Sequence, residues 1–117
     1  MTIKIKRIYQ APSSDDGIRI LVDRLWPRGV SKEKAKLDYW LKEIGPSNDL
    51  RKSFHHESKT FEDFREAYKE ELKYGKQKEA LEQLKDIVKE HDHITLLFAA
   101  KNEDANQAHV LKDLLKS

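Results

Sequence analysis

The sequence predicts an α/β fold: a single three-layer domain with a mostly parallel central sheet of about four strands flanked by helices. Two short, almost wholly apolar runs, residues 18–22 and 94–99, have the length and composition of buried central strands. Between and after them lie helical patterns at residues 61–72, 76–90 and 104–115. Right-handed crossovers between such elements make most of a sheet parallel, so the two apolar runs are expected to be parallel neighbours or near neighbours at its centre.

Length and composition limit the class of protein. The chain has 117 residues, enough for one domain with a real core, and 38% of them are hydrophobic and 38% charged. Aromatic residues make up 9%, so the composition indicates a folded protein with a highly charged surface rather than a disordered chain. The formal charge is only +2, from 23 Lys and Arg against 21 Asp and Glu, so no specific nucleic acid partner is expected.

Several kinds of site are excluded by what the sequence lacks. It contains no cysteine, which rules out disulfides, thiolate nucleophiles and cysteine-ligated metals. It also contains no Gly-rich phosphate loop, nucleophile elbow or zinc-protease motif, so no cofactor is predicted. No apolar run approaches membrane-spanning length and the first residues do not resemble a signal peptide, so we expect a cytoplasmic protein with no membrane partner. The oligomeric state stays open.

The first segments of the chain give a strand and a loop. Ile3 and Ile5 alternate with Lys4 and Lys6, which is typical of a half-exposed strand near a sheet edge, with the lysines guarding that edge. Residues 11–17 are a loop by composition. After the second strand, Ser31 is expected to cap a short helical turn that ends near residue 35.

Residues 37–44 fit two patterns. Apolar side chains recur at helical spacing at positions 37, 40, 41 and 44, and at strand spacing at positions 37, 39 and 41. The aromatic content, the short length and the stop at Gly45 and Pro46 favour a strand, which is our prediction. Ser47 is then expected to cap a helix that reaches about residue 54.

The remaining helices have clear beginnings. Thr60 and Asp63 form a capping pair for a helix whose aromatic stripe we interpret as core, and Gly75 separates it from the next helix. Asn102 or Asp104 is expected to open the last helix, where unpaired amides and the positive end of the helix dipole attract anions.

The candidate site is centred on residues 22–30, which follow a predicted central strand. Ligands collect at the carboxyl ends of parallel strands, and this stretch places Asp23, Arg24, Trp26 and Arg28 there. Pro27 makes the exit from the strand stiff, and the glycine after Arg28 permits a sharp turn. The arginines suit a carboxylate or a phosphate. An equally good interpretation is that Asp23 and an arginine form a structural ion pair while Trp26 fills the core.

Lys101 and Arg51 extend this candidate site. Lys101 follows the other predicted central strand, so its loop reaches the same edge of the sheet, and Arg51 lies on the intervening helix. These residues are expected to line one cleft together with Asp23 and with Arg24 or Arg28. Surplus positive charge there predicts a small anionic ligand of the phosphate or carboxylate type.

The histidines predict no metal site. His55 and His56 are adjacent in sequence, and His91 and His93 flank an aspartate, but neither spacing is a recognised ligand motif. His56 is the better candidate for acid/base chemistry. We assign Asp23 and His56 as the candidate catalytic residues.

Three segments carry a resemblance to a known family, which covers nearly the whole chain: residues 22–30, the Pro46-Ser47 pair followed by Leu50-Arg51, and residues 96–101 followed by Asn106. Together they resemble the YeaO-like family, domain of unknown function 488, which has no settled activity and therefore implies a fold and a site location more than a function. Larger relatives carry cysteines after the last strand that this chain lacks. The resemblance places a histidine after a phenylalanine at the position of His56, which is why His56 is the preferred histidine. The histidine that the family has on the last helix is replaced here by Gln107, which weakens any family-wide role for a histidine on that helix.

Two classes of function remain. In the first, the protein binds a small anion, with or without catalysis of a reaction, and the binding residues are Arg24, Trp26, Arg28, Arg51 and Lys101. In the second, it is a protein-interaction module that uses the Trp26 to Arg28 loop, or an exposed tryptophan, without catalysis. The two differ in whether this loop faces a concave pocket or a flat surface.

Overall fold

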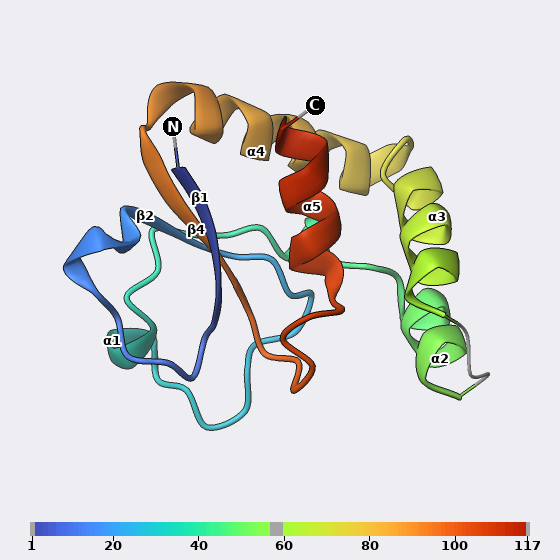
Figure 1. Cartoon of the computed structure of the whole chain (residues 1–117), viewed down its shortest axis with the longest axis horizontal. Coiled ribbons are helices and arrows are strands. Elements are labelled where there is room, and N and C mark those ends of the chain that lie inside the picture. Colours follow the sequence, from blue (N-terminus) through green and yellow to red (C-terminus); the bar gives the residue numbers. More distant parts are fainter. Residues whose placement is uncertain (1, 57–59, 117) are drawn as a thin grey trace.

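The computed structural model describes residues 2–56 and 60–116, with nothing described for the side chains of residues 55 and 56 (Figure 1). Its sheet has four parallel strands in the order β1-β4-β2-β3. The strands are β1 (Thr2–Arg7), β2 (Ile18–Leu21), β3 (Tyr39–Trp40) and β4 (His93–Phe98). β2 and β4 are hydrogen-bonded neighbours at the centre, as their apolar sequences predicted. The α/β class and the parallel sheet are thus confirmed.

The two faces of the sheet have different cores. Alternate side chains of β2 and β4, such as Ile20, Leu96 and Phe98, pack into the larger core formed with the long helices. On the other face, Leu21 and Leu97 pack in a smaller cluster under loops and one short helix. Because the central strands are covered on both sides, they need apolar residues at nearly every position.

Four helices serve the larger core: α2 (Asn48–His56), α3 (Phe61–Glu71), α4 (Gly75–Glu90) and α5 (Gln107–Lys116). Figure 1 shows α2 and α3 side by side at one end of the molecule, with α4 crossing the opposite end of the sheet from the loops that follow β2 and β4. On the other face, the one α-helix that the described residues form is the one-turn helix α1 (Lys32–Ala35).

The predicted caps are confirmed. Ser31 accepts a hydrogen bond from the amide of Lys34, and the Ser47 hydroxyl accepts one from the amide of Leu50. Thr60 and Asp63 form a reciprocal capping box at the start of α3. These bonds depend on residues only two or three positions apart, which is why the sequence alone reveals them.

Residues 37–44 form less strand than predicted. Only Tyr39 and Trp40 pair with β2, and the chain then enters a single 3-10 turn, Lys42–Ile44. This turn buries Ile44, whose carbonyl accepts a hydrogen bond of 2.5 Å from the hydroxyl of Tyr68. The packing of Ile44 against α3 therefore ends the strand early.

The lysines of β1 do not guard the sheet edge, although β1 is an edge strand. Lys4 and Lys6 instead place their Nζ atoms 3.2 and 3.1 Å from Asp16, on the face opposite the long helices. Asp16 ends a 3-10 turn, Ser14–Asp16, inside the stretch predicted as plain loop. It also binds the buried Arg19 of β2 at 2.5 Å, an ion pair that the apolar pattern of β2 conceals.

The last helix begins later than predicted. Asn102 accepts hydrogen bonds from the amides of Asp104 and Ala105, which makes a turn rather than the first turn of a helix. Asn106 is the residue that caps α5, because its side chain accepts from the amide of Ala108. The prediction that Asn102 or Asp104 opens this helix was therefore wrong.

Candidate functional site

A cleft of about 790 Å³ opens at the carboxyl ends of β2 and β4. Its walls come from residues 23–28 after β2, residues 99–107 between β4 and α5, and side chains of α2 and α3. Six of the seven site residues chosen from the sequence line it: Asp23, Arg24, Trp26, Arg28, Arg51 and Lys101. The seventh, His56, lies at the end of α2, and its side chain is outside the described residues.

Asp23 is held by hydrogen bonds rather than by an arginine. One carboxylate oxygen accepts from the amide of Ala99 at 2.9 Å, and the other accepts from the side-chain amide of Gln107. Burial raises the pKa of Asp23 to about 6, although the Ala99 amide, Gln107 and the charge of Arg51 each act to lower it. Among the described residues Asp23 forms no ion pair with a neighbouring arginine, so the ion-pair part of that sequence-based alternative was wrong, although Trp26 does pack against the smaller core cluster.

Arg24 has a structural role at the rim of the cleft. It donates hydrogen bonds to the carbonyls of Gly45 and Pro46 at 2.7 and 3.2 Å, and its Nη1 lies 3.7 Å from a carboxylate oxygen of Glu43. The backbones approach so closely that a Cβ on Gly45 would lie 2.8 Å from the amide nitrogen of Arg24. The guanidinium thus fixes the turn that leads into α2, although it still lines the cleft.

Trp26 is a rigid part of the cleft wall. Its indole N–H donates to the carbonyl of Val30 at 2.7 Å, across a turn in which Gly29 has a φ of 79°. Its ring meets Trp40 edge to face, with the centroids 5.2 Å apart, and the indole N–H of Trp40 donates to the carbonyl of Asp23. These contacts tie the residues 23–28 loop to β3.

Arg28 and Lys101 offer exposed charges at the mouth of the cleft. Both side chains are exposed, and in the described part of the chain neither forms an ion pair. The backbone of this loop is fixed nonetheless, since the Tyr9 hydroxyl donates to the carbonyl of Arg28 at 3.0 Å. Arg28 and Lys101 therefore project from the loops at the mouth of the cleft, and no carboxylate of the described residues pairs with either of them.

Arg51 is the cation with unused hydrogen-bonding capacity. α2 carries it into the cleft, where one of its terminal nitrogens donates to the Asn48 side chain at 2.5 Å. Its Nε is buried and has no hydrogen-bond partner among the described residues. A buried donor without a partner costs free energy, which a bound acceptor would recover.

The charges of the cleft do not balance. Among the described residues, its lining carries four cations, Arg24, Arg28, Arg51 and Lys101, against the single acid Asp23. Since Asp23 has a pKa near 6, even that negative charge is weakly held. The lining therefore has a surplus of positive charge within reach of solvent.

His91, His93 and His109 do not line this cleft. His91 and His93 lie at the amino end of β4, the opposite end of the strand, and His109 contacts the carbonyl of Glu103 through its Nε2. Within residues 2–56 and 60–116, no group of three or more His, Cys, Asp or Glu side chains is arranged to hold a metal ion.

Sequence reasoning missed two parts of the site. Gln107 was noted only as a replacement for a histidine, yet it is the hydrogen-bond partner of Asp23. Phe64, as part of the aromatic stripe of α3, was assigned to the core alone, and residue 54 was predicted only as the end of a helix, but Phe54 and Phe64 both line the cleft. The helical stripe that predicted the burial of Phe64 contained no signal for a cavity beside it.

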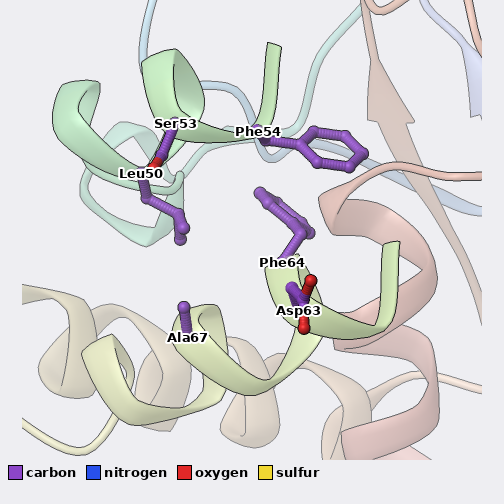
Figure 2. Close-up of a pocket in the computed structure, with 6 residues that line it drawn as sticks. All are labelled: Leu50, Ser53, Phe54, Asp63, Phe64 and Ala67. Carbon is purple, nitrogen blue, oxygen red and sulfur yellow. The ribbon is translucent and has the colours of Figure 1, made fainter. Parts of the chain in front are cut away.

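A second, smaller cavity of about 320 Å³ lies between α2 and α3 (Figure 2). Leu50, Ser53 and Phe54 project toward it from α2, and Phe64 and Ala67 from α3. Phe54 and Phe64 line both this cavity and the large cleft, so the two aromatic rings divide them.

Comparison with known proteins identifies the family. A family model described as the inactive DUF488-N3 subclade matches residues 2–117. The chain belongs to this subclade. It is 49% identical to the uncharacterized protein YeaO of Escherichia coli K12 over all 117 residues, which cover 99% of that protein. This confirms the resemblance drawn from residues 22–30, 46–51 and 96–106.

More distant relatives match part of the chain. The uncharacterized proteins Rv3073c of Mycobacterium tuberculosis and Mb3100c of Mycobacterium bovis are each 40% identical to it over 70 residues, 60% of this chain and 59% of theirs. No solved structure matched the chain. No helix of the described residues is long and apolar enough to cross a membrane.

Proposed function

We propose that this protein binds a small anion of the phosphate or carboxylate type in the cleft at the carboxyl ends of β2 and β4, without catalysing a reaction. The observation that carries the proposal is the unused donor of Arg51 in a cleft whose lining has four cations and one acid. An anion there would accept from Arg51 and offset the surplus charge contributed by Arg28 and Lys101.

The absence of catalysis is part of the proposal. The subclade is described as inactive, which supports binding over turnover. The chain also has no cysteine, so it has no thiol nucleophile. Asp23 has a pKa suited to proton transfer, but Ala99 and Gln107 already occupy both of its oxygens, which supports a role in shaping the cleft.

The alternative, a protein-interaction module, has support of its own. Leu25, in the loop after β2, is 61% exposed, and Tyr39 and Trp40 of β3 are each 37% exposed. Yet the Trp26 to Arg28 loop lines a concave cleft, and this concavity is the feature expected of a small-molecule site. We therefore favour anion binding.

Thermal stability in the presence of anions tests the proposal. Inorganic phosphate, sulfate or acetate, added at constant ionic strength against chloride, is expected to raise the melting temperature in a saturable manner, because a ligand that prefers the folded state stabilises it. Arg51→Gln and Lys101→Gln should each reduce this shift.

Matched controls separate binding from general charge effects. Lys52→Gln lies next to Arg51 on α2, and Lys89→Gln removes an exposed lysine of α4, outside the cleft lining. Both should leave the shift unchanged. Equal responses to all anions including chloride, or equal losses in the control variants, would overturn the proposal.

A further inference from the structure

We infer that the anion carries an apolar body of about the size of an aromatic ring, and that Phe54 and Phe64 receive this body. The inference deepens the proposed function and rests on it. It concerns the substituent of the ligand, whereas the proposed function concerns only its phosphate or carboxylate group.

The size of the cleft is the first argument. At about 790 Å³ it lies in the range of about 300 to 1,000 Å³ that is typical of sites for drug-sized molecules. A bare phosphate or acetate would fill a small part of this volume and leave the rest to water. Apolar side chains make up a large share of the wall, including Trp26, Pro27, Pro46, Phe54 and Phe64.

The second argument is the order of residues on α2. Arg51 and Phe54 are three positions apart, so they lie on one face of the helix, one turn from each other, and both line the cleft. An anionic group bound at Arg51 therefore has its substituent directed along or past the ring of Phe54. The rings of Phe54 and Phe64 lie 4.8 Å apart at an angle of 34°, which continues the apolar surface onto α3.

The cavity between α2 and α3 is the third argument. Phe54 and Phe64 line both spaces, so each ring faces a cavity of about 320 Å³ in addition to its contacts with the core (Figure 2). Side chains beside such space can shift at lower cost than those in a filled core. The wall can therefore adjust to a ring placed against it.

Calorimetric titration with matched anions tests this inference. Phenyl phosphate is compared with inorganic phosphate, and benzoate with acetate, so that the aromatic ring is the main difference within each pair and the two pairs distinguish a phosphate from a carboxylate group. We expect the aromatic member of at least one pair to bind at least about tenfold more tightly than its partner, because the ring leaves water for an apolar wall.

Variants of Phe54 locate the ring. Phe54→Ala should reduce the affinity for the aromatic anion at least about fivefold and leave that for inorganic phosphate or acetate unchanged, since it removes only the apolar wall. Phe54→Leu keeps an apolar side chain and secures the test if the alanine variant folds poorly. Phe61→Ala is the matched control, because Phe61 stacks on Phe64 but does not line the cleft.

The outcomes distinguish the two proposals. If phosphate and phenyl phosphate bind equally, and benzoate and acetate do so too, the inference is overturned while the proposed function stands. If none of the four binds, the proposed function fails and the inference with it. If Phe54→Ala and Phe61→Ala cause equal losses, the ring does not lie where we place it.

Discussion

A buried and a half-buried aspartate at opposite ends of β2 are held in opposite ways. Asp16, before the strand, is 1% exposed and is surrounded by Lys4, Lys6 and Arg19. Burial alone would raise its pKa, but the Ser13 amide and these three cations together hold it well below the usual range. Asp23, after the strand, meets only uncharged donors directly, and its pKa rises to about 6.

The comparison shows that partners, rather than burial, decide what a buried carboxylate does. At Asp16 the local charges are committed to one another, and the cluster serves the fold. At Asp23 the nearby cations of the cleft remain outside direct contact with the acid, so they stay available for a ligand. The first pattern is typical of a structural ion cluster and the second of a binding site.

The largest expected effect comes from breaking the Asp16 cluster. Asp16→Ala leaves the buried Arg19 without its carboxylate, and we expect the free energy of unfolding to fall by about 3 to 5 kcal/mol in urea denaturation at pH 7. Asp15→Ala is the control, because the Asp15 side chain is 79% exposed. If the free energy of unfolding falls by the same small amount in both variants, the cluster does not stabilise the fold.

The pH dependence of stability distinguishes Asp23 from Asp16. The pKa of Asp23 is raised from 3.8 to about 6, so folding favours its protonated form, and its contribution to stability declines as pH rises from about 4 through 6. Asp23→Asn should remove this decline and raise the free energy of unfolding at pH 7.5 by about 1 to 3 kcal/mol relative to the parent protein, with little difference at pH 4. For Asp16 the sign is opposite, because a lowered pKa gives stability above about 3.8 that is lost in acid.

Urea denaturation at a series of pH values checks this difference. Asp49→Asn, at an exposed position of α2, is the control, and its free energy of unfolding should vary with pH in the same way as that of the parent protein. If the free energy of unfolding of the parent protein does not fall relative to that of Asp23→Asn between pH 4 and 7, the raised pKa of Asp23 is contradicted.

A smaller effect is expected on anion affinity. Protonation of Asp23 removes the one acid from the described lining of the cleft, which leaves Arg28, Arg51 and Lys101 unopposed there, whereas Arg24 keeps its ion pair with Glu43. Sulfate, which stays doubly charged over this range, should bind several-fold more tightly at pH 5 than at pH 7.5 at constant ionic strength. Titration of Asp23→Asn should show a weaker dependence on pH. If the sulfate affinity of Asp23→Asn depends on pH as strongly as that of the parent protein, a titratable group other than Asp23 causes the dependence.

The smallest changes in stability are expected at the mouth of the cleft. Arg28→Gln and Lys101→Gln remove exposed charges without partners among the described residues and should change the free energy of unfolding by no more than about 0.5 kcal/mol. Arg24→Gln should cost about 1 to 2 kcal/mol, because it breaks hydrogen bonds to Gly45 and Pro46. Thermal unfolding of the three variants checks this order, and equal losses would contradict it.

Much of the fold followed from local sequence. The apolar runs that became β2 and β4 identified the centre of the sheet, and Ser31, Ser47 and Thr60 marked helix starts. The cleft lining also followed, because the loops after neighbouring parallel strands must reach the same edge of the sheet. Each of these conclusions depends on neighbours in sequence or on a general rule of topology.

Contacts between distant segments decided the rest. Asp23 obtains its partners 76 and 84 residues later in the chain, at Ala99 and Gln107, so its pKa could not be anticipated from the stretch around it. Arg19 was hidden in an apolar strand because its charge is met by Asp16 and by the carbonyl of Ala35 on the far face of the sheet. The sequence by itself determined which residues reach the edge of the sheet, while only the tertiary structure decided which charges are bound to one another there, because hydrogen bonds and ion pairs depend on distances in space that no local pattern encodes.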